Sequence, residues 1–408
     1  MKFSQSDTLF RRAAKVIPSG AYGHTSPHCS LPVHFPKFSE RASGYKFWDT
    51  DGNEWIDFMC GFGTVIHGYC EPSIENAVNE SRYSGTVFNQ PHPVIVELAE
   101  SLTQTIDFAD WAVFAKNGSD LTTWAIRVAR EFSHRSLIIK ASGSYHGVDA
   151  WCDPGKGGRI PSDRSDILEF NWNDLNQFED LFRTNKDAIA GVILTPYHHP
   201  SFAPSVMPTK EFWLGVRRIC DENGALLILD DVRAGWRLSS GGSHRYFGFS
   251  PDLAIYSKAL GNGYSISACV GKELFKKAAS EVFLTGSCWN DSSAMVAALQ
   301  SLKLSTQRDV AKSVLRKGEV FCKELEKAGN KYGFDFHMTG PTSMPYPWFR
   351  GDDDLYLIRK FCELAAMVGL FYHPYHNWFI SDSHSYESLK EAIDLSEKVF
   401  FDLSEKIK

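Results

Sequence analysis

The sequence lacks closely spaced cysteine pairs. Its nine cysteines are scattered along the chain, and none belongs to a Cys-x-x-Cys motif. A structural zinc site or a disulfide framework needs paired cysteines at short spacing, so neither is expected and no metal site is predicted. Reduced and mostly buried thiols, as in a cytoplasmic protein, are the simpler interpretation.

Clustered basic residues and long apolar runs are also missing. The formal net charge is -6, whereas nucleic acids and anionic membranes bind basic patches, so neither is an expected partner. No window approaches the roughly 18 uncharged apolar residues that a transmembrane helix needs. Residues 1–20 lack the continuous apolar stretch of a signal peptide.

Short apolar runs alternate with helical patterns in the middle of the chain. Apolar runs of this length that end in Gly, polar or acidic residues are typical of buried parallel strands with crossover helices. The pattern therefore predicts an α/β domain. The runs are WAVFA (111–115), SLIIKA (136–141), GVILTP (191–196), ALLILDDV (225–232), DLAIYS (252–257) and ISACVG (266–271).

The two ends of the chain have a different pattern. Residues 47–58 alternate around Asp51-Gly52, which predicts a hairpin. Residues 354–367 are predicted to be helical and 370–381 to form a strand. Ser385 is the expected N-cap of a last helix over 386–404.

The length of 408 residues favours one large domain with a smaller companion. We predict a large α/β domain over residues 65–305. Residues 1–64 and 306–408 are expected to build a small α+β domain from both termini.

Ligands of parallel α/β sheets bind beyond the carboxyl ends of the strands. Gly118 and Ser119 follow the first run and open a helix, so their N–H groups suit a phosphate, although simple helix capping is the alternative. Tyr145, His146 and Gly147 follow the second run. Tyr145 could stack on a flat ring or pack as an ordinary loop aromatic.

Two adjacent carboxylates, Asp230 and Asp231, close the apolar run 225–232. A buried carboxylate needs a partner, which could be a pyridinium nitrogen, a metal, or a nearby arginine. Lys258 follows the next run. Burial there would lower its pKa toward imine chemistry, whereas a lone surface lysine would have no such role.

Taken together, these motifs resemble class III aminotransferases, and most closely the glutamate-1-semialdehyde aminomutase branch. The resemblance extends from about Leu9 to Phe400. The motifs that carry it are FWDTDGNEWIDF (47–58), KNGSDL (116–121), YHG (145–147), LILDDVRAGWR (227–237), PDLAIYSKALGNGYSISACVG (251–271) and LTGSCWND (284–291).

The resemblance implies pyridoxal 5'-phosphate (PLP) as cofactor and the fold of type I PLP enzymes, with a mainly parallel seven-stranded sheet. Lys258 would hold PLP as a Schiff base and carry a proton in the reaction. Asp230 would pair with the pyridinium nitrogen. Tyr145 and Val232 would cover the two faces of the ring.

The remaining cofactor contacts implied by the resemblance are Gly118, Ser119 and His146. Ser287 would reach the phosphate in the neighbouring subunit, which implies a homodimer with its active site at the subunit interface.

The chain departs from the aminomutases where those enzymes bind the substrate carboxylate. Ser26 replaces an arginine, and His376 replaces a glutamate. Tyr22, His24 and His376 are the predicted substrate contacts. Such neutral groups favour a hydroxylated, sugar-like or phosphorylated carbonyl acceptor over a dicarboxylate.

The predicted activity is an aminotransferase that moves an amino group from a small-molecule donor to an aldehyde or ketone. An aminomutase, an epimerase or a decarboxylase on the same scaffold is the alternative, because all use the same cofactor. A non-catalytic binding protein is a third hypothesis, and Lys258 and Asp230 count against it.

Overall fold

A computed structural model of the chain describes residues 1–23, 31–32, 34–155, 157–200 and 202–407. The chain forms two compact units. Unit 1 comprises Met1–Glu71, Phe202–Pro204 and Ser313–Lys408, and unit 2 comprises Pro72–Ser201 and Ser205–Lys312. Each helix in the described part of the chain is too short or too polar to span a bilayer. The domain boundaries at 64/65 and 305/306 stay a prediction.

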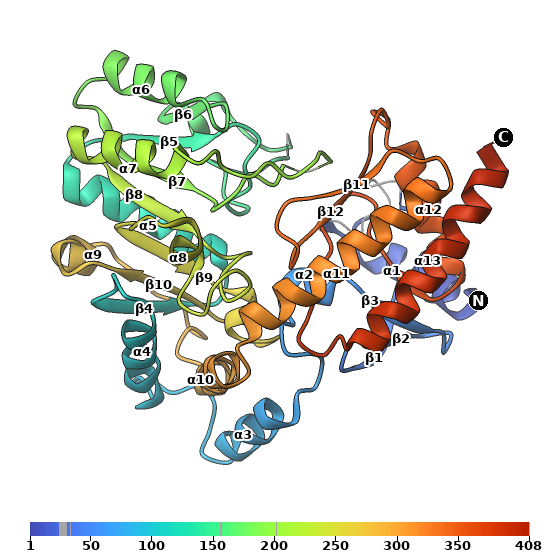
Figure 1. Ribbon diagram of the computed structural model, residues 1–408. Helices are drawn as coiled ribbons and strands as arrows, with labels where there is room; N and C mark the ends of the chain where they lie inside the picture. Colours follow the sequence, from blue (N-terminus) through green and yellow to red (C-terminus); the bar gives the residue numbers. More distant parts are fainter. Residues whose placement is uncertain (24–30, 33, 156, 201, 408) are drawn as a thin grey trace. The chain divides into compact units, whose positions relative to one another are not determined.

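Unit 2 is built around the predicted seven-stranded sheet (Figure 1). In order across the sheet, its strands are β4 (Trp111–Ala115), β10 (Ser267–Gly271), β9 (Leu253–Tyr256), β8 (Leu226–Asp230), β7 (Ile189–Leu194), β5 (Leu137–Ala141) and β6 (Ile167–Phe170). Five of these strands, from β9 to β6, pair in parallel. The fold class inferred from the sequence is therefore confirmed.

The strand prediction was wrong in two details. The run at 266–271 forms β10, which is antiparallel to both β9 and β4. Only residues 257–266 join β9 to β10, whereas a parallel crossover needs about a dozen residues or more. The strand β6 was not among the predicted runs, because Ile167–Phe170 has four residues and Glu169 interrupts its apolar run.

Unit 2 contains several helices besides its seven-stranded sheet. They are α3 (Pro72–Arg82), α4 (Val94–Thr105), α5 (Gly118–Ser133), α6 (Leu175–Thr184), α7 (Phe212–Asn223), α8 (Ser243–Phe247), α9 (Lys276–Glu281) and α10 (Ser292–Gln307), with short 3-10 turns at η3 (Pro161–Arg164), η4 (Lys258–Leu260) and η5 (Glu273–Phe275).

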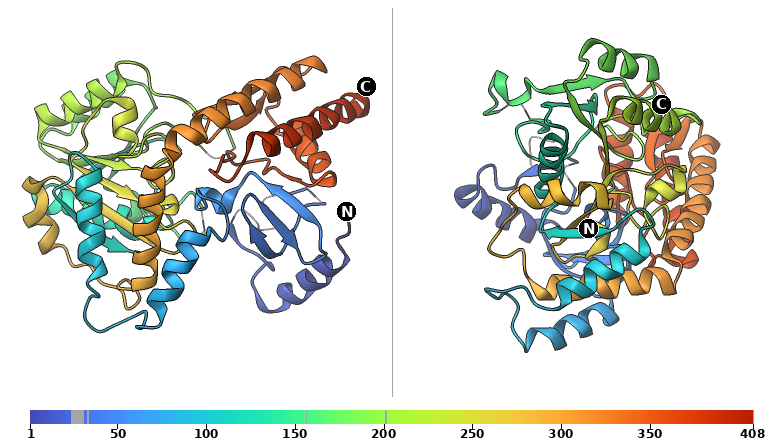
Figure 2. Two further views of the ribbon diagram at one scale, coloured as in Figure 1. Left: turned by 60° about the horizontal axis from the view of Figure 1, so that its bottom comes forward. Right: turned by 90° about the vertical axis from the view of Figure 1, so that its left-hand side faces the viewer.

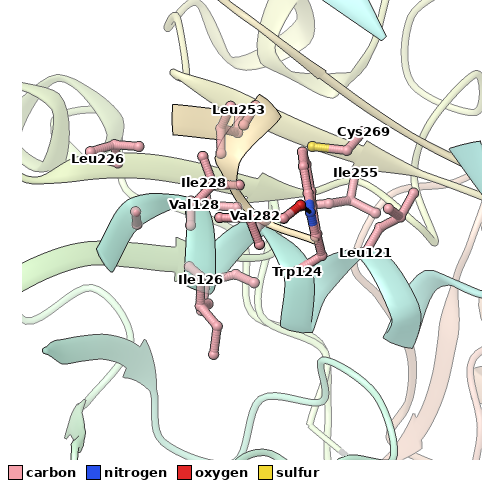
Figure 3. Packing of buried hydrophobic residues seen from close by; sticks show 14 of the residues in the cluster. Leu121, Trp124, Ile126, Val128, Leu226, Ile228, Leu253, Ile255, Cys269 and Val282 are labelled. Atoms are coloured by element: carbon pink, nitrogen blue, oxygen red, sulfur yellow. Dashed lines mark hydrogen bonds between the residues drawn. The ribbon is translucent and has the colours of Figure 1, made fainter. Parts of the chain in front are cut away.

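The core of unit 2 lies between α5 and the sheet (Figure 3). Trp124 and Val128 of α5 pack with Ile228 of β8 and Ile255 of β9 in one cluster. All five residues of β8 are buried, so both faces of this strand are covered. A side chain at its end is consequently held by rigid surroundings.

Unit 1 combines segments from both ends of the chain (Figure 2). A four-stranded sheet has the order β1 (Ser39–Ser43), β2 (Lys46–Asp49), β3 (Glu54–Asp57), β13 (Leu370–Phe371), and β11 (Phe336–Thr339) pairs with β12 (Tyr346–Phe349). The helices are α1 (Ser4–Val16), α2 (Cys60–Gly63), α12 (Tyr356–Met367) and α13 (Tyr386–Ile407), with α11 (Val310–Lys331) continuing from unit 2.

The predicted hairpin at 47–58 is present, because β2 and β3 pair antiparallel around Gly52, whose φ is 79°. The predicted cap of the last helix is confirmed, since the Ser388 N–H donates to Ser385 Oγ at 3.1 Å. The predicted strand at 370–381 was wrong beyond Phe371. Pro374 has no N–H group to continue a ladder, so the chain leaves the sheet after β13.

The core of unit 2 gives a stability prediction. Ile228→Ala should lower the free energy of unfolding by about 2–5 kcal/mol, because it leaves a cavity in the cluster below α5. Leu274→Ala is the matched control, since Leu274 is 68% exposed and should change stability by about 0.5 kcal/mol or less. Urea unfolding followed by tryptophan fluorescence measures both. Equal losses would contradict the assigned core.

Candidate active site

The predicted cofactor residues of unit 2 follow strands that run in the same direction. Asp230 ends β8, Lys258 comes two residues after β9, and Tyr145 lies in the loop that follows β5. The strands β5, β7, β8 and β9 pair in parallel, so their carboxyl ends meet at one edge of the sheet. The fold therefore gathers residues that are more than 100 positions apart in sequence.

Asp230 is buried and held by two donors. His146 Nδ1–H donates to Asp230 Oδ2 at 2.7 Å, and the Val232 N–H donates to Oδ1 at 3.2 Å. The other ring nitrogen of His146 lies 3.0 Å from Ser144 Oγ. Thr122 Oγ1 donates to the His146 carbonyl at 2.6 Å, which ties the loop to α5. The Asp230 carboxylate is thus fixed in orientation.

Asp231 has separate surroundings. Ser243 donates to it twice, from N–H at 2.8 Å and from Oγ at 2.7 Å. Burial raises the pKa of Asp231 to about 7 against these hydrogen bonds, and the adjacent charge of Asp230 adds to the rise. The two neighbouring carboxylates therefore have different partners, and it is Asp230 that is tied to the loop carrying Tyr145.

Lys258 has a backbone conformation that is rare for a non-glycine residue, and the pKa of its amine is lowered. Its φ of 47° lies in the left-handed region, which residues with a Cβ atom rarely adopt. Burial lowers the pKa of the amine to about 7, and the positive charge of Arg233 acts in the same direction while Asp230 opposes both. Near neutral pH, a large fraction of the amine is therefore an unprotonated nucleophile.

The start of α5 makes a narrow turn against Val232. A Cβ built on Gly118 would lie 2.7 Å from Val232 Cγ2, so only glycine fits there without a shift. Ser119 Oγ accepts a hydrogen bond from the Val148 N–H at 3.2 Å, which joins the turn to the loop after Tyr145. The first N–H groups of this long helix suit a phosphate dianion.

Tyr145 keeps part of its ring accessible at this edge of the sheet, with 38% of the residue exposed. Burial of the rest raises the pKa of its phenol. The partly buried Val232 lies beside Gly118. An accessible aromatic face and an aliphatic side chain near Asp230 are suited to a flat ring.

The other predicted site residues lie in a turn of unit 2, in unit 1 or outside the described residues. Ser287 is exposed in a turn of unit 2. In unit 1, Tyr22 is 82% exposed, and His376 is buried with its Nδ1–H donating to the Asn377 carbonyl at 2.8 Å. His24 and Ser26 lie outside the described residues.

Sequence reasoning did not assign three nearby residues to the site. Arg233 was considered as one of the arginines that could pair with the two aspartates after the run at 225–232. It lies within electrostatic range of Lys258 and of Tyr197, whose pKa burial raises to about 12. His199 lies within range of both Lys258 and Arg233. Tyr197 and His199 belong to the polar stretch directly after the run at 191–196, and nothing in that stretch shows which side chains turn toward the lysine.

The comparisons with known proteins identify the family. The family model described as Aminotransferase class-III matches residues 31–339. The chain is a class III aminotransferase. The family resemblance seen in the sequence is thereby confirmed, together with PLP as the cofactor.

Relatives of this class III aminotransferase cover nearly its whole length. An aminopentol aminotransferase of Sphingopyxis macrogoltabida is 36% identical over 96% of this chain and 93% of its own length. A 3-aminobutyryl-CoA aminotransferase of Cloacimonas acidaminovorans is also 36% identical, over 97% and 96% of the two chains. A glutamate-1-semialdehyde 2,1-aminomutase of Persephonella marina is 28% identical over 98% of this chain and 99% of its own.

A solved structure supports the same conclusion. The FumI protein of Sphingopyxis sp. MTA144, described as its PLP internal aldimine form, superposes with a TM-score of 0.97 at 35% identity. The match covers 99% of this chain and 97% of that one.

The residues at the strand ends fit PLP. A depressed amine pKa at Lys258 suits covalent attachment, and the fixed Asp230 carboxylate suits a ring nitrogen. Gly118 places no side chain at the start of α5, where the first N–H groups of the helix suit a phosphate. These residues of unit 2 therefore fit the amine-reactive, ring and phosphate groups of the cofactor.

The low pKa of Lys258 gives a pH prediction. The rate at which the apoprotein attaches PLP covalently should rise with pH through about 7 and then level off, because only the neutral amine reacts. An ordinary lysine would keep gaining rate up to about pH 10. Stopped-flow absorbance at a series of pH values measures this, with Lys258→Ala as the control that forms no covalent link. A rate that still climbs above pH 9 would contradict the prediction.

Proposed function

We propose that this enzyme transfers an amino group from a small amino acid to an aldehyde or ketone that carries neutral hydroxyl or carbonyl groups, and that in reverse it transfers the amino group of the resulting amine to a small keto acid. The observation that carries the proposal is the uncharged character of the polar groups near Lys258 and Arg233. Burial lowers the pKa of His199 well below 6.5, so its ring is neutral within range of Lys258. Tyr197 and Tyr145 lie within range of Arg233, and their phenols are uncharged at neutral pH. Neutral donors and acceptors match hydroxyl and carbonyl groups better than a second carboxylate.

The names of the relatives point the same way. Aminopentol denotes an amine that carries hydroxyl groups, and 3-aminobutyryl-CoA has its amine two carbons from a thioester carbonyl. Both relatives are more similar to this chain than the 28% identical aminomutase is. The replacement of the aminomutase arginine by Ser26 supports the same class of substrate.

The amino acid donor needs a cation, and we assign this role to Arg233. Its guanidinium is partly buried near Lys258, Tyr197 and Tyr145. A carboxylate that enters a desolvated site without a cation would be costly, and a guanidinium can bind it through two hydrogen bonds. Arg233 would thus bind the carboxylate of the amino acid in one half-reaction, and the neutral groups would bind the hydroxyl or carbonyl groups of the other substrate in the second.

The remaining roles follow from the geometry within unit 2. PLP, when bound, supplies a ring that takes up the electrons of a bond broken at the amine-bearing carbon. Lys258 Nζ would accept the proton that leaves that carbon and pass it to the carbon of the cofactor that receives it in the transfer. Asp230, oriented by His146, would keep a proton on the ring nitrogen. Tyr145 and Val232 would hold the ring flat, and Gly118 and Ser119 would bind the phosphate.

Further parts of the proposal rest on the family resemblance. We infer a cytoplasmic homodimer in which Ser287 contacts the phosphate bound by the other subunit. Tyr22, His24 and His376 are proposed to line the substrate side of the site. Aminomutase, epimerase and decarboxylase activities stay the alternatives, because each would use Lys258 and Asp230 in the same places.

A donor and acceptor screen tests the proposed function. Amino acids and hydroxylated amines should convert the bound cofactor stoichiometrically to its amine form, which the cofactor's absorbance reports. Borohydride should fix the cofactor to the peptide containing Lys258. Glutamate-1-semialdehyde should give little or no 5-aminolevulinate, because Ser26 offers no cation for its carboxylate. Efficient formation of 5-aminolevulinate would refute the proposed substrate class.

Asp230 and Asp231 should differ in their effect on the reaction. Asp230→Asn should slow proton removal from the amine-bearing carbon by about a hundredfold or more, because a neutral amide does not hold a proton on the ring. Asp231→Asn should slow it much less, since this side chain binds Ser243. Single-turnover rates and the deuterium isotope effect measure the step. A larger loss at Asp231 would reverse the assignment.

A further inference from the structure

His199 is a buried histidine whose ring has no hydrogen-bond partner within the described residues. Only 8% of the residue is exposed, yet neither Nδ1 nor Nε2 makes a hydrogen bond with another residue in this part of the chain. Burial holds the pKa of the ring well below 6.5. The ring is therefore neutral at pH 7, with one N–H to donate and one nitrogen to accept. Leaving both unmatched in the interior is costly.

The location of His199 suggests what satisfies these atoms. It follows β7, whose carboxyl end lies beside that of β8, where Asp230 sits. The positive charges of Arg233 and Lys258 both act on its ring. The ring of Tyr197 packs edge-on against it, with centroids 5.1 Å apart. His199 thus lies near the amine at which every substrate must react.

The neighbouring histidine has a different environment. His198 stacks on Trp172 with centroids 5.7 Å apart, and its backbone pairs with Val206. The charges that act on its ring are those of His146 and Lys140, and Lys258 is not among them. Within the described residues, His199 is the member of the pair whose ring is influenced by the reactive lysine.

We propose that His199 binds a neutral oxygen, either a hydroxyl or a carbonyl, on the carbon next to the amine-bearing carbon of the substrate. This inference rests on the proposed function and names the residue that would form a hydrogen bond with an uncharged oxygen of the substrate. A substrate with an oxygen at this carbon supplies the missing partner, whereas a hydrocarbon analogue leaves the ring nitrogens unmatched. His199 is therefore assigned as a specificity-determining residue.

A matched pair of amines tests the proposal. The amines 2-aminopropan-1-ol and butan-2-amine differ by a hydroxyl in place of a methyl group, and both enantiomers of each are used. The rate at which each converts the cofactor of the holoenzyme to its amine form is followed by stopped-flow absorbance. The wild-type protein should prefer the better amino alcohol enantiomer over the corresponding amine by about tenfold or more.

Three variants assign this preference to the ring. His199→Phe keeps an aromatic ring of similar size and should bring the preference close to one, by slowing the amino alcohol and not butan-2-amine. His199→Gln keeps a donor and an acceptor and should retain part of the preference. His198→Phe is the matched control and should leave the ratio of the two rates as in the wild type.

The outcomes separate this inference from the proposed function. If His199→Phe slows both amines equally, or shifts the absorbance or the affinity of the resting cofactor, His199 serves the cofactor and the inference is overturned. It is also overturned if the wild-type protein converts both amines at equal rates, although the proposed function then stands. If no amine converts the cofactor of the wild-type protein, the proposed function itself fails.

Discussion

The hydrogen bond between His146 and Asp230 joins two distant parts of the chain at the point where the site forms. Asp230 ends a strand with both faces buried, so its carboxylate has little access to water. His146 Nδ1 approaches it to 2.7 Å from the loop after β5. That loop carries Tyr145, and Thr122 of α5 donates a hydrogen bond to the loop at the His146 carbonyl. A buried carboxylate thus sets the spacing between the aromatic loop, the central strand and the helix that would bind the phosphate.

Burial is also the common cause of the electrostatics around this bond. It lowers the pKa of Lys258 to about 7 and raises that of Asp231 to about 7. In each case the low-dielectric interior favours the uncharged form. The chemical consequence differs, because a neutral lysine is a nucleophile, whereas the Asp231 side chain accepts two hydrogen bonds from Ser243 and supports that turn. Burial therefore makes Lys258 reactive, whereas the buried Asp231 has a structural role.

Local pattern and tertiary contacts contributed differently to the fold. The apolar runs located six strands of the sheet, because strands buried on both faces need continuous apolar residues. The direction of β10 depended on the length of its connection to β9, a constraint that composition does not express. The end of β13 depended on Pro374 and on hydrogen bonds to distant segments, such as the Phe379 N–H to the Phe58 carbonyl. The aromatic composition of residues 370–381 does not predict such hydrogen bonds, because their partners are far away in the sequence.

The sequence by itself determined the family, the cofactor and the chemical groups expected at the strand ends, because ordered motifs such as those at Gly118, Asp230 and Lys258 are local and distinctive. The family resemblance implied that Asp230 rather than Asp231 pairs with the ring nitrogen, but it did not show which protein groups bind either carboxylate. Only the tertiary structure decided that His146 binds Asp230 while Ser243 binds Asp231. It also singled out His199 from His198, since adjacent residues point to different neighbours and their hydrogen-bond partners come from segments far away in the chain.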